Sequence, residues 1–178
     1  MAESFGRFWP EIESRQDAYL LSPRMGGLSV KVRGGRALEV KVYLGSPGIL
    51  EVPGHARGRL QSWRKWSFPF RPDSQDDSER PGWWPVDKTR RISRFSFGSG
   101  QVSAELTDVR ARGRAWWSLG FEATGPVDLL RDELEATAAH VFAQALPDGV
   151  RLRVDDSRSY AEWLHWQLNT DGEAGAHG

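Results

Sequence analysis

The sequence predicts a mainly β, α+β fold in one domain, with helices confined to the C-terminal part. Over most of residues 13–125, apolar and polar residues alternate, as in LSVKVRGGRALEVKV (28–42). After Pro126 the apolar residues recur at helical spacing instead. The chain has 178 residues, of which 39% are hydrophobic, and this is enough for one core.

The alternating segments predict antiparallel strands joined by short turns. The first hairpin turns at Gly34-Gly35, a pair suited to the positive φ of tight hairpin turns. A short basic helix is expected after residue 51, leading into a strand near 65–70, and 71–82 reads as an exposed loop. The other expected strands are 13–21, 28–33, 37–42, 86–97, 101–111 and 116–125.

Two helices are expected to follow the strands. One spans about 126–146, with Pro126 in its first turn. A short strand at 151–154 precedes a second helix at 157–168, where Ser159 and Glu162 have the spacing of a capping box. We expect one domain over 1–168 and a disordered tail over 169–178.

Composition and charge exclude several classes of function. Lysine plus arginine equals aspartate plus glutamate, 24 against 24, so no general electrostatic attraction to nucleic acid or anionic membrane is expected. Cysteine is absent, which excludes disulfides and thiolate chemistry. The four histidines lack metal-ligand spacing, and neither a phosphate-binding glycine loop nor a GxSxG motif is present. With no signal peptide or membrane-length apolar run in the sequence, a cytoplasmic protein is expected.

The polar faces of the strands carry long cations in i, i+2 pairs. Such positions lie about 6.6 Å apart on one face, close enough to straddle phosphates. Two interpretations remain open: a half-solvated sheet, or an antiparallel barrel, eight-stranded or partly open, with a polar interior and both helices covering its apolar outside. Buried cations need interleaved acids or a bound anion. The cations are Lys31, Arg33, Lys41, Lys88, Arg90 and Arg15, the interleaved acids are Glu39, Glu105 and Glu122, and Lys65 is either a ligand or a rim residue.

Four stretches resemble, in order, the motifs of the CYTH or triphosphate tunnel metalloenzyme superfamily, which includes class IV adenylyl cyclases and thiamine triphosphatases. They are RQDAYLL (15–21), LSVKVRGGRALEVKV (28–42), VDKTRRISRF (86–95) and the pair AELTDVRA and SLGFEATG (104–111 and 118–125). SYAEWL (159–164) is similar to the closing helix of that family. The resemblance covers about residues 15–165.

The resemblance implies a β-barrel tunnel that binds a triphosphate or polyphosphate group and hydrolyses it with Mg²⁺ or Mn²⁺. The phosphate-binding residues would be Lys31, Arg33, Lys41, Lys88, Arg90, Arg15 and Lys65, and the metal ligands Glu122, Glu105 and Glu13. Two departures concern the metal side: EIESR (11–15) runs directly into the next motif, and Glu122-Ala123-Thr124 stands where active members carry Glu-x-Glu.

Three functions therefore remain as alternatives. The first is a metal-dependent triphosphatase, and the second is a catalytically silent module of the same fold that binds a nucleotide or polyphosphate. The third is a protein-interaction domain that uses Trp83 and Trp84. In the first two, the partner is a phosphorylated small molecule, with no role for nucleic acid or membrane.

Overall fold

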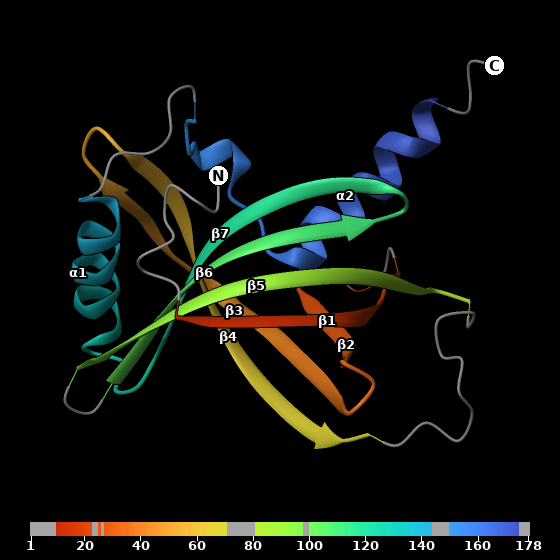
Figure 1. Ribbon diagram of the computed structural model, residues 1–178, viewed down its shortest axis with the longest axis horizontal. Helices are drawn as coiled ribbons and strands as arrows, with labels where there is room; N and C mark the ends of the chain where they lie inside the picture. Colours follow the sequence, from red (N-terminus) through yellow and green to blue (C-terminus); the bar gives the residue numbers. More distant parts are fainter. Residues whose placement is uncertain are drawn as a thin grey trace. The chain divides into compact units, whose positions relative to one another are not determined.

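A computed structural model describes residues 10–22, 25, 27–70, 81–97, 100–143 and 150–174, with side chains as far as residue 167. The protein is mainly antiparallel β, with two α-helices near the C-terminus, which confirms the predicted class (Figure 1). None of the described helices is long and apolar enough to cross a membrane. The strands are β1 (Glu11–Leu20), β2 (Leu28–Arg33), β3 (Ala37–Val52), β4 (Ala56–Pro69), β5 (Trp83–Phe97), β6 (Gly100–Ala111) and β7 (Arg114–Thr124), and the helices are α1 (Leu130–Phe142) and α2 (Tyr160–Ala174).

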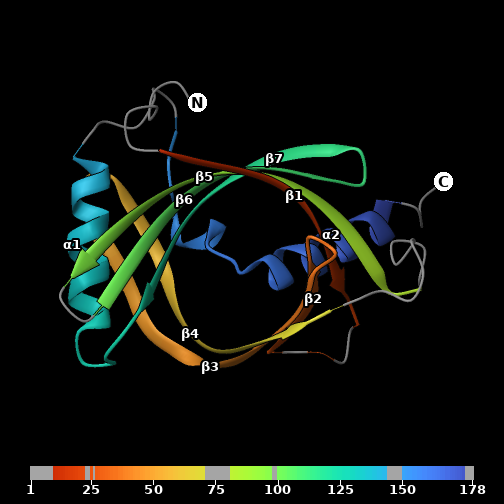
Figure 2. The ribbon, with the colours of Figure 1, turned by 60° about the horizontal axis from the view of Figure 1, so that its bottom comes forward.

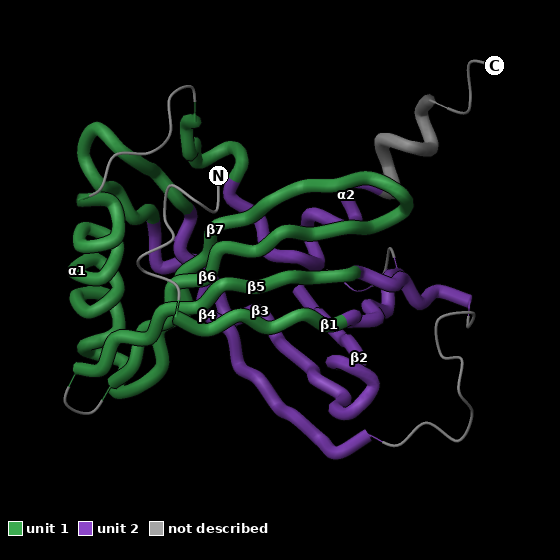
Figure 3. The backbone as a smooth tube through the Cα atoms, viewed as in Figure 1, with its two compact units in different colours: residues 1–15, 49–58, 87–156 green, residues 16–48, 59–86, 157–178 purple. Residues whose placement is uncertain are grey.

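The seven strands are hydrogen-bonded in the order β4-β3-β2-β1-β5-β6-β7. The chain forms two compact units (Figure 3). Unit 1 comprises the described parts of 1–15, 49–58 and 87–156, and unit 2 those of 16–48, 59–86 and 157–178.

Unit 1 is built around the meander β5-β6-β7. The β6–β7 turn places Arg112 at φ 50° and Gly113 at φ 72°, the two positive φ values of a type I′ hairpin turn. One face of these strands is apolar, and α1 packs on it (Figure 1). A buried apolar cluster on this face contains Ala104, Leu106 and Val141, with Phe95, Leu119 and Phe121 packed against it.

Unit 2 contains the predicted hairpin, now β2 and β3. Gly34 and Gly35 have φ values of 54° and 67°, so the turn lies where the glycine pair predicted it. Val30 pairs with Val40 and Lys31 with Glu39, so the apolar residues share one face and the charged residues the other. β1 continues this pattern, because Asp17 pairs with Arg33 and Tyr19 with Lys31.

Several element boundaries differ from the predictions. The expected basic helix is wrong: this segment belongs to β4, where Ala56, Gly58 and Leu60 are half-buried and alternate with exposed arginines, a period of two. The expected strand at 151–154 is reduced to one parallel bridge, Ala56 to Leu152. The expected loop lies outside the described residues at 71–80, as does the end of the tail, 175–178, whereas α2 itself continues to Ala174.

Candidate functional site

The charged residues of unit 2 gather on one face of β1, β2 and β3, with Lys65 of β4 joining them. We call Asp17, Lys31, Arg33, Glu39 and Lys65 the Glu39 cluster. Register explains why the first four meet, because Asp17 lies opposite Arg33 and Lys31 lies opposite Glu39. Alternation therefore places Lys31, Arg33 and Glu39 on one face, where the sequence predicted two cations and an interleaved acid.

Three cations converge on the carboxylate of Glu39. Its Oε2 lies 3.3 Å from Lys31 Nζ, and its Oε1 lies 3.3 Å from an Arg33 nitrogen and 3.2 Å from Lys65 Nζ. Lys31 also donates a hydrogen bond to Asp17 at 3.0 Å. The Glu39 carboxylate is thus contacted by two ammonium groups and one guanidinium group.

Burial divides the Glu39 cluster into an inner and an outer part. The side chains of Asp17 and Glu39 are 0% and 4% exposed, and that of Lys31 is 13% exposed. Arg33 and Lys65 are each 37% exposed. The acids therefore lie at the base of the cluster, and two cations face outward.

The electrostatics of the cluster keep Glu39 ionised. Burial alone would raise the pKa of Glu39. The charges of Lys31 and Lys65, with a smaller effect of Arg33, outweigh burial, and the net pKa falls from 4.5 to about 2. Glu39 is therefore a permanent anion at neutral pH, surrounded by the groups that would bind any other anion.

Two tyrosines, Tyr19 and Tyr160, lie beside Lys31 on the ionic face. Lys31 Nζ lies 5.5 Å from the centre of the Tyr19 ring, and Tyr160 of α2 contacts the same ring at a centroid distance of 6.2 Å. We expected both helices on apolar faces, but α2 begins against the ionic face (Figure 2). A hydrogen bond of 2.9 Å from Gln61 to Glu162 ties its first turn to β4.

The charged residues of unit 1 form a second group around Arg90. The Arg90 guanidinium donates to Glu13 at 3.0 Å and to Glu105 at 3.2 Å, with a further short contact to Glu105. Arg15 donates to Glu13 at 2.6 Å. Two predicted phosphate ligands are thus paired with two predicted metal ligands, and Lys88 is buried on the same strand face as Arg90.

The glutamates predicted as metal ligands are not brought together as a ligand set. Glu13 and Glu105 share the Arg90 guanidinium, while Glu122 is exposed on β7, in register with Ser103. Among the described residues, no group of three or more His, Asp or Glu side chains is arranged to hold a metal ion. A guanidinium between two carboxylates does not fit Mg²⁺ or Mn²⁺, so we assign no metal-dependent step to these residues.

Two further residues, Lys41 and Asp17, lie on the ionic face of unit 2. Lys41 lies on the ionic face of β3, two residues from Glu39 and opposite Ser29. Sequence reasoning assigned no role to Asp17, which is fully buried. Its position between Arg15 and Tyr19 in the same alternation was the available signal.

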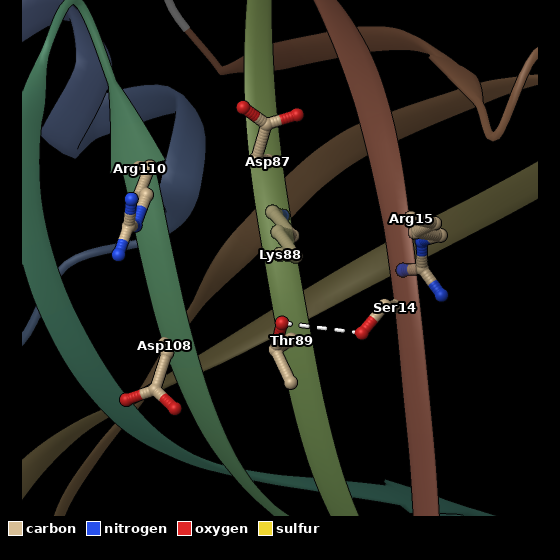
Figure 4. Close-up of a pocket in the computed structure, with 7 residues that line it drawn as sticks. All are labelled: Ser14, Arg15, Asp87, Lys88, Thr89, Asp108 and Arg110. Atoms are coloured by element: carbon tan, nitrogen blue, oxygen red, sulfur yellow. Dashed lines mark hydrogen bonds between the residues drawn. The ribbon is translucent and has the colours of Figure 1, made fainter.

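A polar depression of about 340 Å³ lies on unit 1 (Figure 4). Its lining residues are Ser14, Arg15, Asp87, Lys88, Thr89, Asp108 and Arg110. The hydroxyls of Ser14 and Thr89 face each other at 3.2 Å across β1 and β5, and Asp108 pairs with Arg91 at 2.7 Å. Three bases and two acids line it, but Arg15 is paired with Glu13 and Lys88 is buried, so we assign no ligand to this depression.

No protein-family model matches the chain, and no curated protein sequence matches it.

Proposed function

We propose that the protein binds a triphosphate or polyphosphate group on the ionic face of unit 2. The observation that carries this proposal is the convergence of Lys31, Arg33 and Lys65 on one carboxylate at 3.2–3.3 Å. Phosphate oxygens accept the same charge-assisted hydrogen bonds as a carboxylate. The resemblance of the strand motifs to triphosphate tunnel enzymes supports the same class of ligand.

The outward-facing cations are the first contacts of the proposed ligand. Arg33 and Lys65 are each 37% exposed, and their head groups carry five and three N–H donors, so a second anion can share them with Glu39. Lys41, on the same face, extends the row of cations along β3. The three cations and two acids of the Glu39 cluster leave a formal charge of +1 before Lys41 is counted.

The pairing in unit 1 favours binding over hydrolysis. Glu13 and Glu105 are engaged with Arg90, and hydrolysis of the family type needs such carboxylates to hold a metal ion. We therefore propose a binding module for a small phosphorylated molecule, not for nucleic acid or membrane. The cytoplasm, which holds nucleoside triphosphates, is the compartment this proposal expects.

Titration calorimetry with inorganic triphosphate tests the proposal. Arg33→Gln and Lys65→Gln should each weaken binding by about tenfold, because each removes a charge-assisted contact. Arg57→Gln is the matched control, since Arg57 is an exposed, ion-paired strand arginine outside the cluster. Glu39→Gln should tighten binding, because it removes the competing anion.

Equal binding by Arg33→Gln, Lys65→Gln and Arg57→Gln would refute the proposal. Weaker binding by Glu39→Gln, with its fold intact by circular dichroism, would also contradict it. Phosphate release with Mg²⁺ or Mn²⁺ separates the two activities. Turnover lost in the cluster variants identifies a phosphohydrolase, whereas binding without turnover identifies a binding module.

A further inference from the structure

The outer edge of β4 (Ala56–Pro69) is a structural feature that the proposed function does not use. β4 is the last strand in the hydrogen-bonded order, with β3 as its neighbour. Toward β3, the Phe70 N–H donates to the Arg36 carbonyl at 2.9 Å, and the Leu60 carbonyl accepts from Ser46 at 2.8 Å. Even-numbered residues of β4 therefore direct their backbone groups toward β3.

Odd-numbered residues direct their backbone groups to the outer edge. The first half of this edge is occupied: Arg57 N–H donates to the Leu152 carbonyl at 3.0 Å, and Arg59 N–H to Ser157 Oγ at 2.9 Å. The same alternation turns the N–H and C=O groups of Trp63, Lys65 and Ser67 outward. In the part of the chain that the structure describes, no strand pairs with this half of the edge.

The side chains beside this edge are exposed and partly aromatic. Trp66 is 43% and Phe68 50% exposed, and as i, i+2 residues they lie on one face, about 6.6 Å apart, in line with Arg64. All residues from Arg64 to Pro69 are exposed. Cations on an edge strand discourage pairing with another strand. Exposed Trp and Phe side chains, by contrast, are typical of protein interfaces, and two of them lie beside this edge.

The charge of β4 indicates the chemistry of its partner. The strand contains Arg57, Arg59, Arg64 and Lys65 and no acid. Two copies of β4 paired antiparallel about Lys65 would place the two Lys65 residues opposite each other, which is unfavourable. A strand with an acid opposite Arg64 and apolar residues opposite Trp66 and Phe68 complements all three side chains.

We propose that the 61–67 edge of β4 is a docking site for an extended acidic segment of a partner protein. The segment adds to β4 as a further strand, and the residues on one of its faces are an acid opposite Arg64 and apolar residues opposite Trp66 and Phe68. Backbone hydrogen bonds to Trp63, Lys65 and Ser67 supply affinity, and Arg64, Trp66 and Phe68 supply selectivity.

Binding of a fluorescent peptide that contains Val-Ser-Val-Ser-Glu (the glutamate–valine peptide), followed by anisotropy, tests this proposal, because its valines and glutamate share one face. Ser67→Pro removes one outward N–H and no contact of the Glu39 cluster, whereas Ser67→Ala keeps that N–H. We expect Ser67→Pro to weaken binding at least about fivefold relative to Ser67→Ala, the effect of one lost hydrogen bond. Trp66→Ala should weaken it further, and the lysine–valine peptide, in which lysine replaces that glutamate, should bind more weakly.

Three results would overturn the proposal. They are no binding of the glutamate–valine peptide, equal binding by Ser67→Pro and Ser67→Ala, and equal binding of the lysine–valine peptide. Sedimentation velocity supplies a further check. Dimers of the wild-type protein that are lost in Ser67→Pro would show that a second copy, not an acidic partner, covers this edge.

Discussion

Replacing Glu39 by glutamine should make the protein less stable at neutral pH and its stability less sensitive to acid. Glutamine keeps the shape of the side chain but removes the charge that Lys31, Arg33 and Lys65 contact at 3.2–3.3 Å. Lys31 keeps its partner Asp17 in this variant. The expected loss therefore measures the interaction of one buried carboxylate with its cations.

The magnitude follows from the pKa of Glu39, which falls from 4.5 to about 2 on folding. A tenfold change in proton affinity corresponds to about 1.4 kcal/mol, so the ionised carboxylate contributes about 3 kcal/mol to the free energy of unfolding at neutral pH. Because the pKa is lower in the folded state, this contribution is complete above about pH 4.5. It is lost as the pH falls through about 2.

Urea denaturation of wild type and Glu39→Gln at several pH values between about 7 and 2 measures this difference. The gap between the two proteins should be about 3 kcal/mol at pH 7 and should close progressively below about pH 4.5. Glu135→Gln is the control, because Glu135 is exposed and pairs with Arg131 within α1, so a loss below about 0.5 kcal/mol is expected. A gap that stays constant from pH 7 to pH 3 would refute the electrostatic argument.

Three further substitutions test the packing by the same denaturation assay. Ser159→Ala should cost about 1 kcal/mol, because it removes the capping hydroxyl of α2, which accepts an N–H at 3.3 Å; no loss would contradict that role. Gly120→Ala should be neutral or stabilise the protein by up to about 1 kcal/mol, because a Cβ added there meets no atom within 4 Å and alanine restricts the unfolded chain; a loss above about 1 kcal/mol would contradict this. Leu164→Ala should cost about 2–5 kcal/mol, because this side chain is 1% exposed, and a loss below about 1 kcal/mol would show that the site collapses around the smaller residue.

Local patterns predicted most of the strands, because alternation and turn chemistry act within short segments. The Gly34-Gly35 turn and the β6–β7 hairpin were both predictable from the sequence. The strand expected near 65–70 lies within β4, but the start of β4 was wrongly predicted as a helix, because Pro53-Gly54 and the dense arginines obscured the alternation of half-buried and exposed residues. β4 forms a strand because it pairs with β3, and a short stretch of sequence does not reveal this pairing.

The cations of the candidate site were predictable, but their partners were not. The i, i+2 pairs placed Lys31 with Arg33 and Lys88 with Arg90 on common faces from sequence alone. Which acid neutralises which cation depends on strand register and on neighbours distant in sequence. Arg90 and Glu13, for example, are 77 positions apart. The burial of Asp17 also follows from the assembled sheet, not from its local sequence.

The two compact units are interleaved along the chain, since each is drawn from three separate segments. No single cut of the gene separates one unit from the other, because the backbone passes between them at residues 15–16, 48–49, 58–59, 86–87 and 156–157. A fragment that keeps one unit whole must carry most of the other. Neither unit can therefore be produced by itself as one continuous piece of the chain.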